Sequence, residues 1–228
     1  MRLENFLALT QTTLVNEPYV HSFENIVFEA HRVKRGDLFF AYSQEEIGVA
    51  VANGAYGVIF DKPTQISDNE IAWIKANSLD EALKKLIRFK SIEKEMVAYE
   101  CHEIIFKLSL QIITHSNFLT VFGDLKSVFK TLLEAQEKTT ILFCPALVDK
   151  EMFAVVKKMP HPPYAPIEII EQTLFETSFI YDNVFYERQL ISPFFIPYLE
   201  ELLHVYKILK IEYKLRKFTP IEHFEPIF

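Results

Sequence analysis

The chain has 228 residues, with 24 Lys and Arg against 31 Asp and Glu, which gives a formal net charge of −7. This balance argues against general binding to a nucleic-acid backbone, because such binding depends on Lys and Arg. Hydrophobic residues make up 50% of the chain, enough for a sizeable core, yet no apolar run reaches the roughly 20 residues of a membrane span. Cys101 and Cys144 are too few for a disulfide framework and no secretory signal is recognisable, so we expect a cytoplasmic protein.

Glycine is scarce in this sequence. There are only 5 glycines, where an average usage near 7% would give about 16. All but one lie between Gly36 and Gly57, and the last is Gly123. Glycine supplies positive φ angles and lets a backbone approach a phosphate closely, so the chain after Gly123 cannot hold a glycine-rich phosphate loop.

The first 77 residues alternate between strand and helix signals. A turn at Gly36 precedes an apolar strand, and Gly54 ends the helix that follows, because glycine tolerates the left-handed cap position. We expect strands at 26–27, 38–42 and 58–60 and a helix at 45–53. This strand–helix–strand order is typical of two parallel strands joined by a right-handed crossover.

A second helix begins at Ser78, where Glu81 three residues later completes the pattern of a capping box. Apolar residues line one face of this helix and charged residues cover the rest, as on a solvated helix. The helix leads into the second half of the chain near 86–96. We therefore expect two small domains, at 1–85 and 96–228.

Strand and helix signals also alternate in the second half. We expect strands at 118–122 and 141–144, helices at 127–136 and 197–209, and a hairpin of 177–181 with 184–186 around Asp182–Asn183. The prolines between Pro160 and Pro166 mark a loop. The expected fold class is α/β.

The segment from Val33 to Ile59 resembles a known family. Its pattern is Val33-x-x-Gly36-Asp37-Leu-Phe-Phe-Ala, then a helix, then Gly-Ala-x-Gly57-Val-Ile. This pattern resembles the N-terminal domain of the muramyl-peptide (Mur) ligases, of the types that add a diamino acid or D-alanyl-D-alanine. The resemblance implies ATP-dependent joining of a UDP-muramyl peptide to an amino acid, by a nucleotide-sugar domain, a central ATPase domain and a C-terminal amino-acid domain.

The resemblance implies where a nucleotide sugar would bind. The family has Asp-Ser-Arg before the valine, and the corresponding residues here are Glu29, Ala30 and His31, with Arg32 available by a one-residue shift. Alanine removes a hydroxyl donor, and imidazole is a poor replacement for a guanidinium fork at a phosphate. A remnant of that site would consist of His31, Arg32, Gly36 and Asp37.

The resemblance also implies an ATP-binding loop, Thr-Gly-x-x-Gly-Lys-Thr, between a strand and a helix. Here Gly123, Lys126 and Ser127 occupy the places of the first glycine, the lysine and the hydroxyl. The second glycine is absent, the loop is one residue shorter, and Asp124 brings a negative charge to where anions would lie. We interpret Gly123, Lys126 and Ser127 as a vestigial phosphate loop in a reduced, P-loop-like α/β domain. ATP and Mg²⁺ are expected as cofactors only if this loop still works.

The end of the chain resembles the family in outline. The helix beginning near Pro193 has aromatic residues where the family has polar ones, and the run 218–225 resembles the exit from the central domain. The sequence ends soon after, so we expect the family's C-terminal domain to be missing. The aromatic residues of this region form either core or an interaction surface; they are Phe194, Phe195, Phe224 and Phe228.

Other reactive residues point to no specific chemistry. Cys101-His102-Glu103 lacks the three or four suitably spaced ligands of a metal site, which favours a core cysteine beside surface polar residues. A pair of Cys144 with His161 or His115 cannot be placed from sequence alone. We therefore predict no catalytic residue and no metal site.

Three functional hypotheses follow. The first is a non-catalytic Mur-ligase-like protein that acts through contacts with another protein in peptidoglycan precursor synthesis or cell-wall assembly. The second is a module or enzyme that retains part of the ligase site and binds a nucleotide sugar or ATP. The third is an unrelated α/β protein whose match at 36–57 is due to chance. We favour the first, with no resident cofactor and no nucleic-acid partner; the partner and the oligomeric state stay open.

Overall fold

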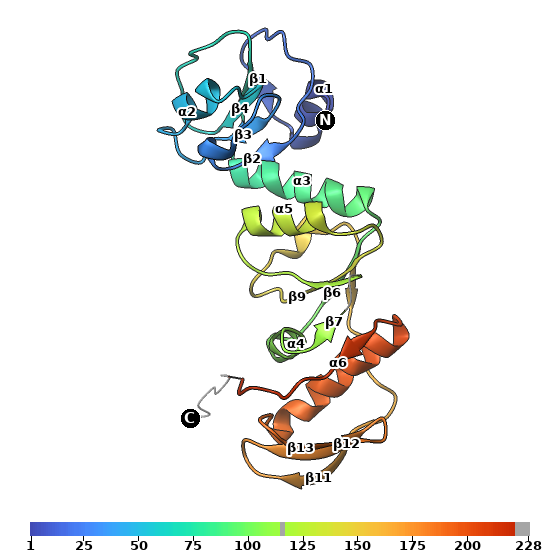
Figure 1. The fold of residues 1–228 in the computed structure, drawn as a ribbon. Coiled ribbons are helices and arrows are strands. Elements are labelled where there is room, and N and C mark those ends of the chain that lie inside the picture. The colour runs from blue at the N-terminus through green and yellow to red at the C-terminus, as the bar shows by residue number, and fades with distance from the viewer. Residues whose placement is uncertain (115–116, 222–228) are drawn as a thin grey trace. The chain divides into compact units, whose positions relative to one another are not determined.

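A computed structural model of the chain describes residues 1–114 and 117–221 (Figure 1). Contacts within the chain divide it into two compact units. Among the described residues, the first unit contains 1–90 and 124–130, and the second contains 91–114, 117–123 and 131–221. The expected domains were 1–85 and 96–228. Residues 124–130, which were expected in the second domain, belong to the first unit.

The first unit is built on a five-stranded sheet with the order β1-β5-β4-β3-β2, in which β2 to β5 run parallel and β1 is antiparallel to β5. The strands are β1 (Thr13–Leu14), β2 (Ile26–Val27), β3 (Leu38–Phe40), β4 (Gly57–Phe60) and β5 (Ala72–Lys75). The helices are α1 (Leu3–Thr10), the 3-10 helix η1 (Ala30–Arg32), α2 (Ile47–Ala52) and most of α3 (Leu79–Glu93). Every residue of β3 and β4 is buried, as a parallel sheet covered on both faces requires.

Two glycines of the first unit stand where a side chain would not fit. A Cβ atom added to Gly57 would lie 2.7 Å from the Phe23 ring. Gly36 has a φ of +101°, and an added Cβ there would lie 3.0 Å from the Glu24 side chain. These two glycines of the family-like pattern therefore have roles in packing and turn geometry.

The second unit contains a parallel sheet with the order β10-β6-β9-β8. Its strands are β6 (Val97–Glu100), β8 (Phe118–Thr120), β9 (Thr140–Phe143) and β10 (Val156–Lys158). Helix α4 (Glu103–Ser109) follows β6, and α5 (Leu125–Glu134) connects β8 to β9. The residues of α5 up to Lys130 belong to the first unit.

Two antiparallel sheets and helix α6 (Ile196–Ile208) complete the described part of the second unit. One sheet has the order β11-β12-β13, and the other pairs β7 with β14. Their strands are β7 (Ile113–Thr114), β11 (Glu168–Gln172), β12 (Thr177–Tyr181), β13 (Val184–Gln189) and β14 (Tyr213–Lys214), and the 3-10 helices are η2 (Lys150–Met152) and η3 (Pro193–Phe195). Leu199 and Leu202 of α6 are fully buried in one core with Phe179 of β12.

The expected α/β fold class is confirmed. Strands β3 and β4 flank α2 and pair in parallel, with Leu38 opposite Gly57. The expected hairpin is also present: Asp182 and Asn183 have φ angles of +53° and +61°, as a two-residue type I′ turn requires. Sequence reasoning missed six strands, which are short or carry no period-two burial pattern: β1, β5, β7, β10, β11 and β14.

The described residues form neither a membrane-spanning helix nor a metal-binding cluster. In residues 1–114 and 117–221, no helix combines the length and the apolar character that crossing a membrane would need. In the same ranges, no three His, Cys, Asp or Glu side chains are grouped so that they could hold a metal ion.

Candidate functional site

The start of α5 lies where the sequence resembles a phosphate loop. Gly123 has a φ of +98°, so the chain turns there with the left-handed geometry that glycine allows. The next residue, Asp124, caps the helix: its Oδ1 accepts a hydrogen bond from the backbone N–H of Ser127 at 2.8 Å. Hydrogen bonds from the hydroxyl and the backbone of Ser127 lower the pKa of Asp124 below its ordinary value. A carboxylate of this chain therefore occupies the first turn of the helix.

Lys126, which was predicted to correspond to a phosphate-loop lysine, contacts an aromatic ring within the first unit. Its Nζ lies 4.1 Å from the centroid of the Tyr42 ring, within the range of a cation–π interaction. The Tyr42 hydroxyl donates to Oδ1 of Asp80 at 2.9 Å. Burial, followed by the interaction with Asp80, raises the pKa of Tyr42 well above its ordinary value. The phenol is therefore a neutral donor at physiological pH.

Lys130, one helical turn after Lys126, makes a second set of contacts in the first unit. Its Nζ lies 2.8 Å from Oε1 of Glu29 and 5.7 Å from the centroid of the Phe28 ring. The Phe28 ring meets the Phe129 ring edge to face at 5.8 Å. The hydrogen bond from Lys130 lowers the pKa of Glu29, and the charges of Arg32 and Lys126 lower it further. Glu29 is thus affected by one cation of each predicted site: Arg32 of the nucleotide-sugar remnant and Lys126 of the vestigial phosphate loop.

Of the four residues of the predicted nucleotide-sugar remnant, two have a structural role and two are exposed. Asp37 is only 2% exposed, and its carboxylate accepts hydrogen bonds from the Asn25 amide and the Lys34 backbone N–H, both at 2.9 Å. Gly36 forms the adjoining turn. His31 and Arg32 are exposed on η1. Asp37 and Gly36 have structural partners, whereas a role of His31 and Arg32 in binding stays a prediction.

Sequence reasoning missed the residues that hold the start of α5. Tyr42, Asp80 and Phe28 were not singled out, because each is far from 124–130 in the sequence. The high aromatic content, with 21 Phe and 10 Tyr, was the one available signal. In the structure, Lys126 and Lys130 of this helix contact the aromatic rings of Tyr42 and Phe28.

The cysteines of the second unit are buried, and His102 beside Cys101 caps a helix. Cys101 and Cys144 are buried, free thiols, and burial raises the pKa of Cys101 far above its ordinary value. The Nδ1 atom of His102 accepts from the Ile104 backbone N–H at 3.2 Å, which caps α4, and its ring stacks on Tyr198 at 4.7 Å. These contacts agree with the expected core cysteine.

The aromatic residues near Pro193 divide between core and surface. Phe195 is partly buried against the main core of the second unit, whereas Phe194 is 70% exposed. Phe224 and Phe228 lie outside the described residues.

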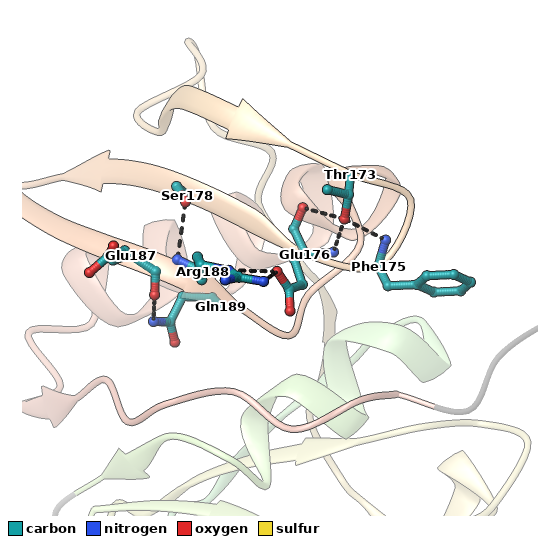
Figure 2. Close-up of polar contacts among 7 residues, drawn as sticks. All are labelled: Thr173, Phe175, Glu176, Ser178, Glu187, Arg188 and Gln189. Carbon is teal, nitrogen blue, oxygen red and sulfur yellow. Dashed lines mark hydrogen bonds and ion pairs between the residues drawn. The ribbon is translucent and has the colours of Figure 1, made fainter.

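A polar network holds the turn between β11 and β12 in place. Figure 2 shows that the Thr173 hydroxyl oxygen accepts hydrogen bonds from the backbone N–H groups of Phe175 and Glu176, at 3.3 and 3.0 Å. Arg188 donates from Nε to Oε2 of Glu176 at 3.0 Å and from its backbone N–H to the Ser178 hydroxyl at 3.0 Å. Arg188 has a φ of +45° at a bulge in β13, so these contacts hold a conformation that L residues seldom adopt.

Comparison with known proteins identifies the fold. No family model and no curated protein matches the sequence. Among solved structures, the chain is similar to MurF from Acinetobacter baumannii, with a TM-score of 0.58 and 12% identity, over 92% of this chain and 65% of that one. It is also similar to MurF ligase from Thermotoga maritima in complex with ADP, with a TM-score of 0.52 and 12% identity, over 82% of this chain and 63% of that one.

The likeness to these ligases concerns the fold. The α/β units of this chain match Mur ligase folds over most of its length, and the chain spans a little under two thirds of each of these MurF chains. The expected resemblance to Mur ligases is thereby confirmed at the level of the fold.

Proposed function

We propose that this protein is a non-catalytic protein with a Mur ligase fold, which acts in the cytoplasm through contacts with another protein in peptidoglycan precursor synthesis or cell-wall assembly. The observation that supports the proposal is that the polar groups of Asp124, Lys126 and Ser127, at the start of α5, contact other residues of this chain. A phosphate loop presents free backbone N–H groups at a helix start and extends its lysine toward the terminal phosphates.

The residues at this position do not fit the phosphates of ATP. The Ser127 N–H, which would face an anion, already donates to the Asp124 carboxylate at 2.8 Å. That carboxylate would repel a triphosphate, and no second glycine lets the backbone wrap around one. The Lys126 ammonium, which would contact the phosphates, lies over the Tyr42 ring. Support for the proposal therefore comes from residues that hold helix α5 rather than a nucleotide.

Isothermal titration calorimetry with ATP–Mg²⁺, together with a phosphate-release assay, tests the proposal. We expect neither binding nor hydrolysis by the wild-type chain. Lys126→Ala and Lys130→Ala are matched variants, since both remove a lysine from the same helix. Hydrolysis that is lost in Lys126→Ala and kept in Lys130→Ala would overturn the proposal.

Titration with a UDP-muramyl peptide tests whether a nucleotide-sugar site is retained. We expect no saturable binding. Binding that His31→Ala or Arg32→Ala abolishes, with Glu45→Ala as an exposed control in the same unit, would contradict a role through protein contacts alone.

A further inference from the structure

Strand β11 is an open edge of the three-stranded sheet. Within the described residues it pairs with β12 alone, and each of its residues, from Glu168 to Gln172, is exposed. An edge strand presents a row of backbone N–H and C=O groups that can pair with a further strand. The opposite edge, β13, is interrupted by the bulge at Arg188. The edge at β11 is therefore the more suitable of the two for strand addition.

Apolar side chains are exposed along this edge and at the turn beside it. Ile170 is 52% exposed, and Leu174 and Phe175, at the tip of the turn, are 54% and 57% exposed. Turns of this kind usually carry Gly, Pro, Asn, Asp or Ser, so the turn itself does not require Leu and Phe. In Figure 2 the Phe175 ring points away from the polar network of the turn. Exposed apolar residues gathered beside an open edge are typical of an interaction site.

The turn is already ordered without a partner. The backbone N–H of Thr173 donates to the Glu176 carbonyl at 2.8 Å. The Thr173 hydroxyl accepts from the backbone N–H groups of Phe175 and Glu176. The Glu176 carboxylate is in turn held by Arg188. Because the turn that carries Leu174 and Phe175 is already ordered, binding would cost little conformational entropy at these two residues.

The charge of this sheet defines the chemistry of the partner. From Glu168 to Gln189 the chain has one cation, Arg188, and that cation is bound to Glu176. The register pairs Glu168 with Ile180 and Glu171 with Ser178, and Ile180 and Ser178 share a face of β12. The irregularity at Ile170 therefore places both carboxylates of β11 on the same face of the sheet. A segment with basic residues on that face would match them.

From these observations we infer that β11 accepts, as a fourth strand, an extended segment of a partner protein that carries alternating basic and apolar residues. The basic side chains face Glu168 and Glu171, and an apolar side chain packs against Leu174 and Phe175. A second copy of this chain is a poorer occupant, because pairing β11 with β11 would bring like charges together. This inference rests on the proposed function and names the surface through which the protein contact is made.

Fluorescence anisotropy with the full chain and a labelled synthetic peptide of alternating Lys and Val tests the inference. We expect saturable binding of this peptide, and no binding of an alternating Glu and Val peptide. A Lys and Val peptide with N-methyl groups on alternate residues is also expected not to bind, because it cannot form the backbone hydrogen bonds of a strand pair.

Two matched variants separate the β11 edge from general electrostatic attraction. Glu171 and Glu187 are both exposed and both raise the pKa of Arg188, but only Glu171 lies on β11. Glu171→Lys should weaken peptide binding about tenfold, and Glu187→Lys should leave it within about twofold. Phe175→Ser should weaken it as well. Amide hydrogen exchange should slow at 168–172 when the peptide is added.

Equal effects of Glu171→Lys and Glu187→Lys, binding of the N-methylated peptide, or no binding of the Lys and Val peptide would each overturn the inference. These failures differ from a failure of the proposed function, which appears as ATP hydrolysis that depends on Lys126. If the chain binds no peptide and hydrolyses no ATP, only the inference about β11 fails. If it binds the peptide and hydrolyses ATP, only the proposal of a non-catalytic function fails.

Discussion

The ammonium group of Lys126 lies 4.1 Å from the centroid of the Tyr42 ring. The same tyrosine donates its hydroxyl hydrogen to Asp80 at 2.9 Å. A lysine that the sequence assigns to a phosphate loop is thus held by an aromatic ring of the first unit. This contact makes Lys126 a contributor to stability, and that contribution can be measured independently of any ligand.

Substitution of Lys126 by methionine is expected to lower the free energy of unfolding by about 0.5–1 kcal/mol, because it removes the cation over Tyr42 and keeps most of the aliphatic side chain. Urea denaturation followed by circular dichroism measures this change. Lys62→Met, at an exposed lysine of the same unit, should stay within about 0.5 kcal/mol of the wild type. Equal changes in the two variants would mean that the Tyr42 contact contributes nothing.

Asp124→Ala is expected to cost about 1 kcal/mol of unfolding free energy at neutral pH, because the Ser127 N–H loses its cap. The folded-state pKa of Asp124 lies below the unfolded value, so the carboxylate stabilises the fold at pH above about 4 and loses this effect as the pH falls through the folded pKa.

Asp124→Asn isolates the titration, since asparagine also caps helices but does not ionise near pH 4. As the pH falls from about 5 to about 3, the wild type should lose unfolding free energy relative to Asp124→Asn. Urea titrations at several pH values measure the difference. Parallel pH profiles for the two proteins would rule out this role of the carboxylate.

Asp37→Ala is expected to lower the unfolding free energy by about 1–3 kcal/mol, because the Asn25 amide and the Lys34 N–H lose their buried acceptor. Thermal or urea denaturation provides the measurement, and Glu45→Ala, at an exposed position, is the control. If Asp37→Ala is as stable as the wild type, Asp37 has no structural role, and the prediction of a ligand role for it gains weight.

Gly57→Ala is expected to destabilise the first unit by about 1–3 kcal/mol, because the new Cβ would lie 2.7 Å from the Phe23 ring in a packed core. Gly48→Ala is the matched control. No atom lies within 4 Å of a Cβ added at Gly48, which is inside α2, so this change should stabilise the helix by about 0.5–1 kcal/mol. Stabilisation by Gly57→Ala, or no change, would contradict the packing role of Gly57.

Local signals in the sequence predicted the elements on which the fold depends. Glycine at 36 and 54, between apolar runs, predicted β3, α2 and β4, and Asp182–Asn183 predicted the turn between β12 and β13. These features depend on neighbouring residues: turns need particular φ angles, and buried strands need continuous apolar side chains. The resemblance to the Mur ligases rested on the same segment, and the fold comparison agrees with it.

The sequence by itself determined the α/β class and the pattern at 33–59, and it predicted a vestigial phosphate loop at Gly123. It could not determine that Lys126 lies on Tyr42, that Lys130 pairs with Glu29, or that β11 forms an exposed edge. The two lysine contacts join residues that are far apart in the chain. The exposure of β11 depends on which strands pair with it. Only the packing of the complete chain decides such contacts, because the burial and charge of a side chain are set by what surrounds it in space.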